Sequence, residues 1–373
     1  MSASEHTRRL EALRERLEEL DADAAYVSSP ANIAYLSGVR IIPHERLIAL
    51  LLPREGDPRL VVPALEGEAS RNNPAGVAVL EWKDEDGPFG ALEAAFDGSL
   101  PGNDAPRLVL EKDVVTVGLL EGLRERVGVG AAGDVAPVLR ELRMAKSAAE
   151  VALIAEAAAI LDASLAELPE RIRPGRTETE VALELDALVR GKGAEGLPLE
   201  TIVLAGAAGA LPHGKPNARE IRKGDLVVVD VGAVKGGYCA DMTRTFAAGE
   251  PPDRAREVFE VVRRAQEAGR GTVAAGVRCE AVDAAARSVI DAAGYGEFFV
   301  HRTGHGLGLE VHEPPSLMAG NGLRLPLGAV VTVEPGIYLP GFVGVRIEDD
   351  VVARDAGGES LTSYTRELVV CPA

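Results

Sequence analysis

Five side chains of the types that bind divalent metal ions lie between residues 230 and 348 of this chain. They are Asp230, Asp241, His305, Glu334 and Glu348. Four carboxylates with one imidazole suit Mn²⁺, Co²⁺, Fe²⁺ or Zn²⁺ rather than a metal that selects thiolates. Their spacing is typical of a dinuclear metal hydrolase, in which two cations lower the pKa of a shared water and stabilise an oxyanion. The pattern therefore indicates hydrolytic chemistry.

The first two acids lie on two segments that the sequence predicts to form a β-hairpin. Residues 226–232 and 238–246 have the composition of its strands, and a Lys-Gly-Gly turn joins them. If the first two residues of that turn form the loop, Asp230 lies directly opposite Asp241, with Cβ atoms roughly 5 Å apart. Two like charges at that distance repel, so we expect a cation between them.

Three short motifs supply the remaining candidate ligands. His305 lies among glycines, which allow close backbone approach, and His312 follows seven residues later, so either histidine could bind a metal. Glu334 ends a strand at a Pro-Gly turn. Arg346 and Glu348 alternate onto one face of a later strand, where the arginine can hold a carboxylate in place.

Length and composition limit the classes of protein to consider. With 373 residues, of which 46% are hydrophobic, the chain is long enough for two domains and a large core. A net charge of −18 disfavours binding to nucleic acid or to anionic membranes. No apolar run approaches the ~18 residues of a membrane span, and the N-terminus lacks the apolar segment of a secretory signal. We therefore expect a cytoplasmic protein.

The three cysteines are Cys239, Cys279 and Cys371. They are an odd number, they are widely spaced, and none forms a Cys-x-x-Cys pair. The sequence therefore predicts neither a disulfide scaffold nor a structural zinc site.

The elements that must position the candidate ligands fall into two domains. The first ~140 residues alternate helix-like and strand-like stretches in the manner of a small α/β domain. We expect a helix at 7–20, strands at 24–28, 47–52, 60–62 and 108–110, and a loop at 101–106. A helix at 148–168 and a capped helix starting at Thr177 open the second half. We place the domains at 1–142 and 143–373, and the second is expected to be α+β with a central curved sheet.

Several motifs of the second domain occur in an order that identifies a family. They are Leu-Pro-His-Gly at 211–214, the Gly-Gly-Tyr to Thr-Phe segment around Asp241, Gly-His-Gly to His-Glu at 304–313, Val-Glu-Pro-Gly-Ile-Tyr at 333–338 and Gly-Val-Arg-Ile-Glu-Asp at 344–349. This set resembles the proline-specific members of peptidase family M24, the creatinase and methionine-aminopeptidase superfamily. The resemblance implies a pita-bread catalytic domain preceded by a smaller creatinase-type domain. The segments at 25–30, 33–38 and 43–46 are similar to bacterial Xaa-Pro dipeptidases.

The resemblance also implies roles for the candidate ligands. Asp230 would chelate one metal, His305 and Glu334 would bind the other, and Asp241 and Glu348 would bridge them. Two divalent ions are implied for each subunit of a homodimer, with Mn²⁺ first and Co²⁺, Zn²⁺ or Fe²⁺ as alternatives. A hydroxide between the metals would be the nucleophile, and Glu334 would shuttle the proton.

Other residues would contact or support the substrate. The resemblance assigns His213 and His312 to substrate contact and to stabilisation of the tetrahedral intermediate. His301 and Arg346 would line or support the site, and simple packing is the alternative for these two.

The implied reaction is hydrolysis of the Xaa-Pro bond of dipeptides, with aminopeptidase P activity on longer peptides as the alternative. A dipeptidase needs a cation for the substrate carboxylate, but the arginine that some relatives carry after the His-Glu pair is absent, because Glu313 is followed by Pro314. We expect His44 and Arg46 to close over the site of their own or a partner subunit, with an exposed charged turn as the alternative. A catalytically idle binding module is a further alternative, although eroded ligand motifs would be expected for it.

Overall fold

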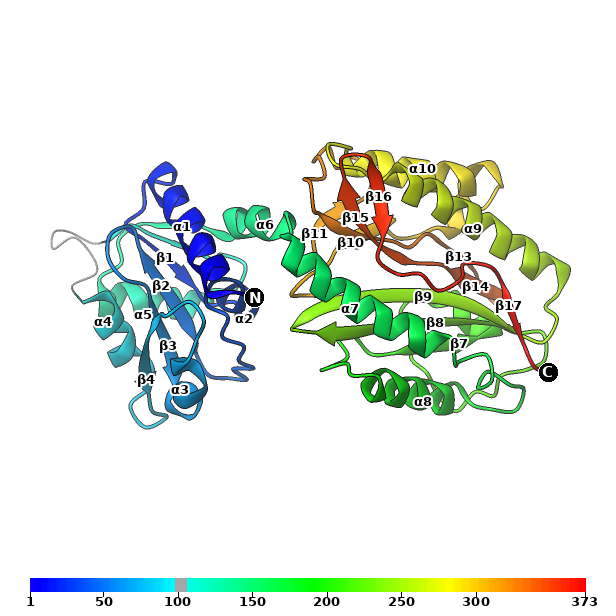
Figure 1. Ribbon diagram of the computed structural model, residues 1–373, viewed down its shortest axis with the longest axis horizontal. Coiled ribbons are helices and arrows are strands. Elements are labelled where there is room, and N and C mark those ends of the chain that lie inside the picture. The colour runs from blue at the N-terminus through cyan, green and yellow to red at the C-terminus, as the bar shows by residue number, and fades with distance from the viewer. Residues whose placement is uncertain (98–105) are drawn as a thin grey trace. The chain divides into compact units, whose positions relative to one another are not determined.

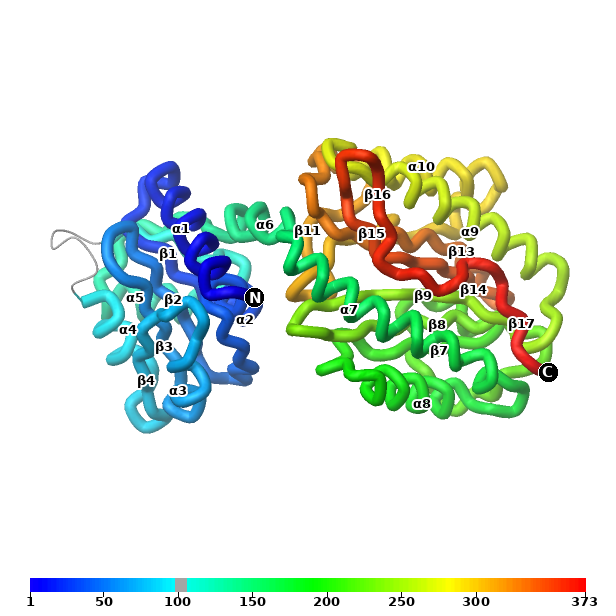
Figure 2. Tube along the Cα trace, viewed as in Figure 1, coloured from blue at the N-terminus to red at the C-terminus, as the bar shows by residue number. Residues whose placement is uncertain are grey.

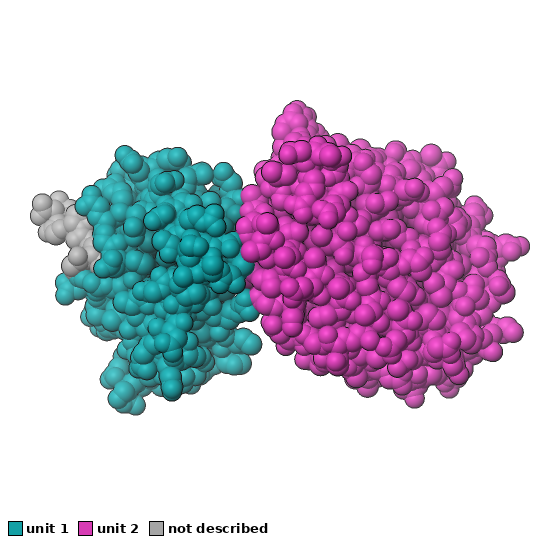
Figure 3. Space-filling view, in the orientation of Figure 1, with its two compact units in different colours: residues 1–143 teal, residues 144–373 magenta. Residues whose placement is uncertain are grey.

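The computed structural model describes residues 1–97 and 106–373, and it divides into two compact units, Met1–Arg143 and Met144–Ala373 (Figure 3). The expected boundary lies between residues 142 and 143. The expected loop at 101–106 lies, except for its last residue, outside the described residues.

The first unit contains a six-stranded mixed sheet with the strand order β4-β3-β2-β1-β5-β6 (Figure 1). Its strands are β1 Ala24–Val27, β2 Ala49–Pro53, β3 Arg59–Pro63, β4 Ala78–Trp82, β5 Leu108–Leu110 and β6 Ala132–Asp134. Its helices are α1 Ala3–Glu19, α2 Pro30–Ser37, α3 Ala64–Arg71, α4 Phe89–Phe96, α5 Val117–Val127 and α6 Ala136–Met144. The helix and the four strands predicted from sequence form here as α1, β1, β2, β3 and β5. Tyr26, Leu51 and Leu123 belong to the hydrophobic core between the sheet and helices α4 and α5.

The second unit contains two larger sheets and a two-stranded ribbon. The four-stranded sheet has the order β17-β9-β8-β7, the five-stranded sheet has the order β11-β10-β12-β15-β16, and β13 pairs with β14. The strands are β7 Ile202–Ala205, β8 Leu226–Lys235, β9 Tyr238–Ala248, β10 Gly304–Gly306, β11 Glu313–Leu317, β12 Val330–Val333, β13 Gly336–Leu339, β14 Val343–Arg346, β15 Asp349–Arg354, β16 Gly357–Ser360 and β17 Val369–Cys371.

Four helices enclose these sheets: α7 Ala148–Leu165, α8 Glu178–Gly191, α9 Asp253–Thr272 and α10 Cys279–Ala292. Helices α7 and α8 pack on β7, β8 and β9, whereas α9 and α10 pack on the ribbon and the five-stranded sheet (Figures 1 and 2). Capping boxes at Ser147 and Thr177 start α7 and α8. None of the helices in the described part of the chain is long and apolar enough to cross a bilayer.

The alternation of strand β8 decides which residues face the interior between the two pairs of helices. Val227, Val229 and Val231 belong to the core under α7 and α8. Successive side chains of a strand point to opposite faces. Asp230 therefore faces away from that core, and Asp241 on β9 does the same because Ala240 and Met242 belong to it.

The register of this hairpin differs from the sequence-based prediction. Asp230 pairs with Thr243, and Asp241 pairs with Gly232, so the prediction that the two acids are directly opposite is wrong. The two turn residues are Gly236 and Gly237, with φ of 53° and 74°, because a tight hairpin turn with positive φ at both positions favours two glycines over Lys-Gly. The acids are diagonal neighbours on one face instead.

The glycines of the predicted His305 motif are required by close packing between strands. A Cβ atom on Gly304 would lie 1.9 Å from the carbonyl oxygen of Thr332, and one on Gly306 would lie 2.2 Å from that of Pro314. Strand β10 therefore fits between β11 and β12 only with glycine at both positions. His305, between them, is held in a fixed place on the sheet.

Candidate metal centre

All five predicted metal ligands line one pocket of about 430 Å³ in the second unit. The other lining residues are Leu199, Glu200, Ile202, Pro212, His213, His301, Arg302, His312 and Arg346. Segments more than 100 residues apart in the sequence therefore meet at this pocket. The acids come from β8 and β9 on one side and from the segments that follow β12 and β14 on the other.

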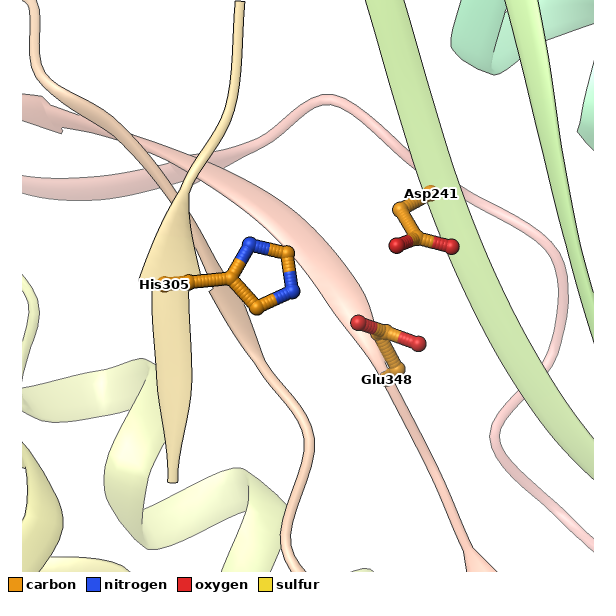
Figure 4. A group of neighbouring side chains, drawn as sticks. All are labelled: Asp241, His305 and Glu348. Carbon is orange, nitrogen blue, oxygen red and sulfur yellow. The ribbon is translucent and has the colours of Figure 1, made fainter. Parts of the chain in front are cut away.

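Three of the ligands form the tightest cluster. Asp241, His305 and Glu348 are buried, and each offers a ligand atom within 4.8 Å of the others. Their side chains point toward one another from β9, β10 and the two-residue segment between β14 and β15 (Figure 4). Glu334 joins them through an Oε1 atom 3.2 Å from Nε2 of His305.

The electrostatics of the cluster are those of a site that needs positive charge. Burial, followed by the charges of Glu348 and Asp230, raises the pKa of Asp241 well above its usual range. Burial, followed by Glu334 and Asp230, does the same to the pKa of Glu348. Burial is the largest single effect on Glu334 and opposes its ionisation, but the hydrogen bond to His305 and the charges of His305, His301 and Arg346 together outweigh it and lower the pKa to about 2. A cation among these carboxylates would relieve the repulsion.

Unpartnered oxygen atoms support the same conclusion. Among the described residues, Oδ1 of Asp230 and Oδ1 of Asp241 are buried without a hydrogen-bond donor. Buried carboxylate oxygens are normally paired, and hard oxygen donors are the ligands that divalent metals take. The residues present therefore fit a metal centre.

A second set of side chains holds the acids in place. Arg346 donates from Nη2 to Asp230 at 2.6 Å and from Nη1 to the Tyr338 hydroxyl at 3.0 Å. Thr243 donates from its hydroxyl to Glu348 at 2.6 Å. The backbone N–H of Asp241 donates to Asp350 at 3.0 Å. The contacts to Asp230 and Glu348 fix the orientation of their carboxylates, and the contact to Asp350 fixes the backbone of Asp241, which is the function of the residues that surround metal ligands.

The three other predicted histidines occupy the pocket wall. His301 lies 2.8 Å from the Tyr338 hydroxyl through Nε2, and burial lowers its pKa. His312 stacks edge to face against His305 with ring centroids 4.4 Å apart, and burial, His305 and Arg302 lower its pKa. His213 is exposed and lines the same pocket. Lowered pKa values keep His301 and His312 neutral at pH 7, so that one ring nitrogen can accept a hydrogen bond.

His44 and Arg46 belong to the first unit. His44 is exposed with a φ of 50°, and Arg46 makes two hydrogen bonds to Asp84, of 2.9 and 2.8 Å. A further ion pair of 2.8 Å joins Arg46 to Glu45. Their proposed part in substrate binding stays a prediction.

The sequence reasoning missed three residues that surround the acids, Thr243, Tyr338 and Asp350, and four that line the pocket, Leu199, Glu200, Ile202 and Arg302. Thr243 follows Asp241 by two positions, so strand alternation places both on one face and could have identified it. Tyr338 lies within a recognised motif, but nothing in the sequence shows that its hydroxyl connects His301 with Arg346.

Two facing sheets enclosed by helices, with a buried cluster of carboxylates and histidine between them, define a metal-dependent hydrolase of the pita-bread type. The chain belongs to metallopeptidase family M24, whose model matches residues 152–355. The model of the creatinase/prolidase N-terminal domain matches residues 9–145. The predicted family and fold class are thus confirmed.

Solved structures of similar proteins cover nearly all of the chain. Dipeptidase PepE from Mycobacterium ulcerans is 38% identical with a TM-score of 0.90 and covers 100% of both chains. An Xaa-Pro dipeptidase from Bacillus anthracis is 32% identical with a TM-score of 0.91, over 98% of this chain and 99% of that one. An X-Pro aminopeptidase from Thermotoga maritima is 34% identical with a TM-score of 0.87, over 97% and 99%.

Proposed function

We propose that this metallopeptidase hydrolyses the Xaa-Pro bond of dipeptides and releases the N-terminal residue. The observation that carries the proposal is the buried cluster of Asp241, His305 and Glu348, in a pocket that Asp230 and Glu334 also line. The similarity to an Xaa-Pro dipeptidase over 98% of the chain supports the choice of substrate.

The five predicted ligands would hold two divalent ions, with Mn²⁺ preferred and Co²⁺, Zn²⁺ or Fe²⁺ as alternatives. Asp230 would belong to one ion, His305 and Glu334 to the other, and Asp241 and Glu348 to both. Bound there, divalent ions supply Lewis acidity, which lowers the pKa of water and offsets charge on the peptide carbonyl oxygen.

The chain's own groups would position the peptide and move the proton. Glu334 is ionised at neutral pH because its pKa is lowered, so its carboxylate can accept a proton from the attacking water and pass it to the leaving nitrogen. His213 and His312 would hydrogen-bond to the substrate and to the developing oxyanion. His301, Tyr338 and Arg346 would hold Asp230 in its orientation.

A substrate with proline after the scissile bond requires an apolar surface in the pocket. An Xaa-Pro bond has no N–H for a hydrogen bond, so recognition must use the ring. Leu199, Ile202 and Pro212 line the pocket and offer it an apolar surface. We propose that the proline ring packs against them.

Aminopeptidase P activity on longer peptides is the second candidate, favoured by the similarity to the Thermotoga X-Pro aminopeptidase. The two activities are separated by assaying an Xaa-Pro dipeptide beside an Xaa-Pro-Xaa tripeptide, on metal-stripped protein with Mn²⁺, Co²⁺ or Zn²⁺ restored separately. We expect restored cleavage of the dipeptide, with an Xaa-Ala dipeptide as the matched control. Cleavage of the tripeptide would make the protein an aminopeptidase P. Silence on both peptides with every metal would overturn the peptidase assignment in favour of a binding role.

We propose that His44 and Arg46 contact the substrate, in their own or a partner subunit of a cytoplasmic homodimer. Arg46→Ala is expected to raise KM for the dipeptide about 10- to 100-fold, because a charged hydrogen bond contributes about 1.5–3 kcal/mol. Asp84→Ala, which removes one of the two carboxylate partners of Arg46 and leaves Glu45, is the control for the ion pair. Unchanged dipeptide kinetics in Arg46→Ala would remove both residues from that role.

A further inference from the structure

Two arginines line the pocket, and they differ in how much of each guanidinium is already used. Arg346 is buried and donates to Asp230, Tyr338 and Thr243. Arg302 is half-buried and donates from Nη1 to the Ser316 hydroxyl at 3.0 Å. Among the described residues, no carboxylate forms an ion pair with Arg302. Its charge is therefore available to a ligand in the pocket.

The position of Arg302 is tied to that of His305. It precedes His305 by three residues, and Ser316, which accepts its hydrogen bond, is the cross-strand partner of His305 on β11. The carbonyl oxygen of Arg302 lies 2.7 Å from Nδ1 of His301. The backbone and one end of the guanidinium are thus fixed, and the other N–H groups remain for a planar anion.

The charge balance of the pocket makes an organic anion the fitting ligand. Two divalent ions would balance the four acids Asp230, Asp241, Glu334 and Glu348, and Glu200 on the pocket wall already pairs with Lys215. Both arginines would then be positive charges in excess. Arg346 is occupied by its hydrogen bonds to Asp230, Tyr338 and Thr243, so Arg302 is the cation that can take a further anion. An Xaa-Pro dipeptide carries its C-terminal carboxylate on the residue directly after the scissile bond, so the carboxylate must lie within the same pocket.

We propose that Arg302 binds the C-terminal carboxylate of the dipeptide and thereby limits the substrate to two residues. This inference rests on the proposed dipeptidase function. Some relatives carry an arginine after the His-Glu pair, but here Glu313 is followed by Pro314 and Pro315. Arg302 would supply the cation that a dipeptidase needs for the substrate carboxylate. Arg46, proposed above to contact the substrate, would add a second contact and not the main carboxylate anchor, because Asp84 and Glu45 already pair with it.

The test compares Ala-Pro with Ala-Pro amide, which lacks only the negative charge, on the metal-loaded full chain. We expect the wild-type protein to prefer Ala-Pro. Arg302→Gln should lower kcat/KM for Ala-Pro about 10- to 100-fold, mainly through KM, which is the range for loss of a charge-assisted hydrogen bond. For Ala-Pro amide, kcat/KM of the same variant should differ from that of the wild type by less than about twofold. Arg302→Lys keeps the charge without the planar guanidinium. Its kcat/KM for Ala-Pro should lie between the values of the wild type and of Arg302→Gln.

Arg264→Gln, an exposed arginine on α9, is the matched control, and thermal melting confirms that each variant folds. An equal loss on both substrates would overturn the proposal, since it would assign Arg302 a structural part only. Unchanged Ala-Pro kinetics in Arg302→Gln would overturn it as well. In either case the dipeptidase function stands, because the wild-type protein still cleaves Ala-Pro. A wild-type protein inactive on both substrates with every metal would instead overturn the function and, with it, the role of Arg302.

Discussion

Replacing Asp241 by asparagine is expected to lower kcat/KM at least about 1,000-fold, because Lewis-acid stabilisation of the transition state contributes several kcal/mol and each 1.36 kcal/mol is tenfold in rate. Isothermal titration calorimetry with Mn²⁺ should show weaker binding or a lower stoichiometry. The metal-free variant should nevertheless melt at a higher temperature than the metal-free wild type. Asp241 is a buried carboxylate whose pKa is raised by burial and by neighbouring acids, so removing its charge relieves repulsion.

The difference in melting temperature between the metal-free variant and the metal-free wild type should increase with pH. A carboxyl group whose pKa is higher in the folded than in the unfolded protein binds protons preferentially in the folded state, so its contribution to stability is lost as pH rises. The advantage of Asp241→Asn should therefore be absent at pH 4 and grow toward pH 8. Asp355→Asn, at an exposed turn, is the control and should change neither property. Full Mn²⁺ binding and activity in the Asp241 variant would exclude this residue as a ligand.

Replacing Lys146 by methionine is expected to destabilise the second unit by about 3–5 kcal/mol, the range for removing one partner of a buried ion pair. Nζ of Lys146 lies 2.7 Å from Oε1 of Glu313, and the side chains are 1% and 3% exposed. The substitution leaves the Glu313 carboxylate buried without the ammonium charge. For a domain of this size each kcal/mol shifts the melting temperature about 2–4 °C, so calorimetry should resolve the effect easily.

The double variant Lys146→Met with Glu313→Leu should recover much of the loss, because a buried pair can be replaced by apolar side chains at little net change. Lys215→Met removes one partner of an exposed pair with Glu200 and should cost less than about 1 kcal/mol. A melting temperature unchanged in Lys146→Met would show that the buried pair contributes nothing to stability.

The sequence was sufficient to predict the fold class, the first helix and strands, and a pocket that contains all five candidate ligands. Hydrophobic periodicity and ordered motifs are local signals, and they place side chains on the correct faces even when the register is wrong. The Asp230 and Asp241 pair illustrates this. Their register depends on which two of three turn residues adopt positive φ, and the Lys-Gly-Gly composition allowed two choices.

The sequence predicted that Arg346 can hold a carboxylate, but it could not show which residues make the contacts that surround the acids, because these contacts join distant segments. Thr243 donates to Glu348 over a separation of 105 residues, and Arg346 reaches Asp230 over 116. Arg302 can bind a ligand because, among the described residues, no carboxylate forms an ion pair with it. Such facts follow from the packing of two sheets against each other, which periodicity within a single strand does not contain.

Strand β8 has two faces with different tasks, since Val227, Val229 and Val231 fill the core beneath α7 and α8 while Asp230 faces the pocket. A shift of one residue exchanges the faces of a strand. Inserting or deleting a single residue here would therefore bury the acid among aliphatic side chains and turn valine toward the peptide. Folding and catalysis depend on the same alternation, so evolution can vary side chains along this strand but cannot change its length without losing both.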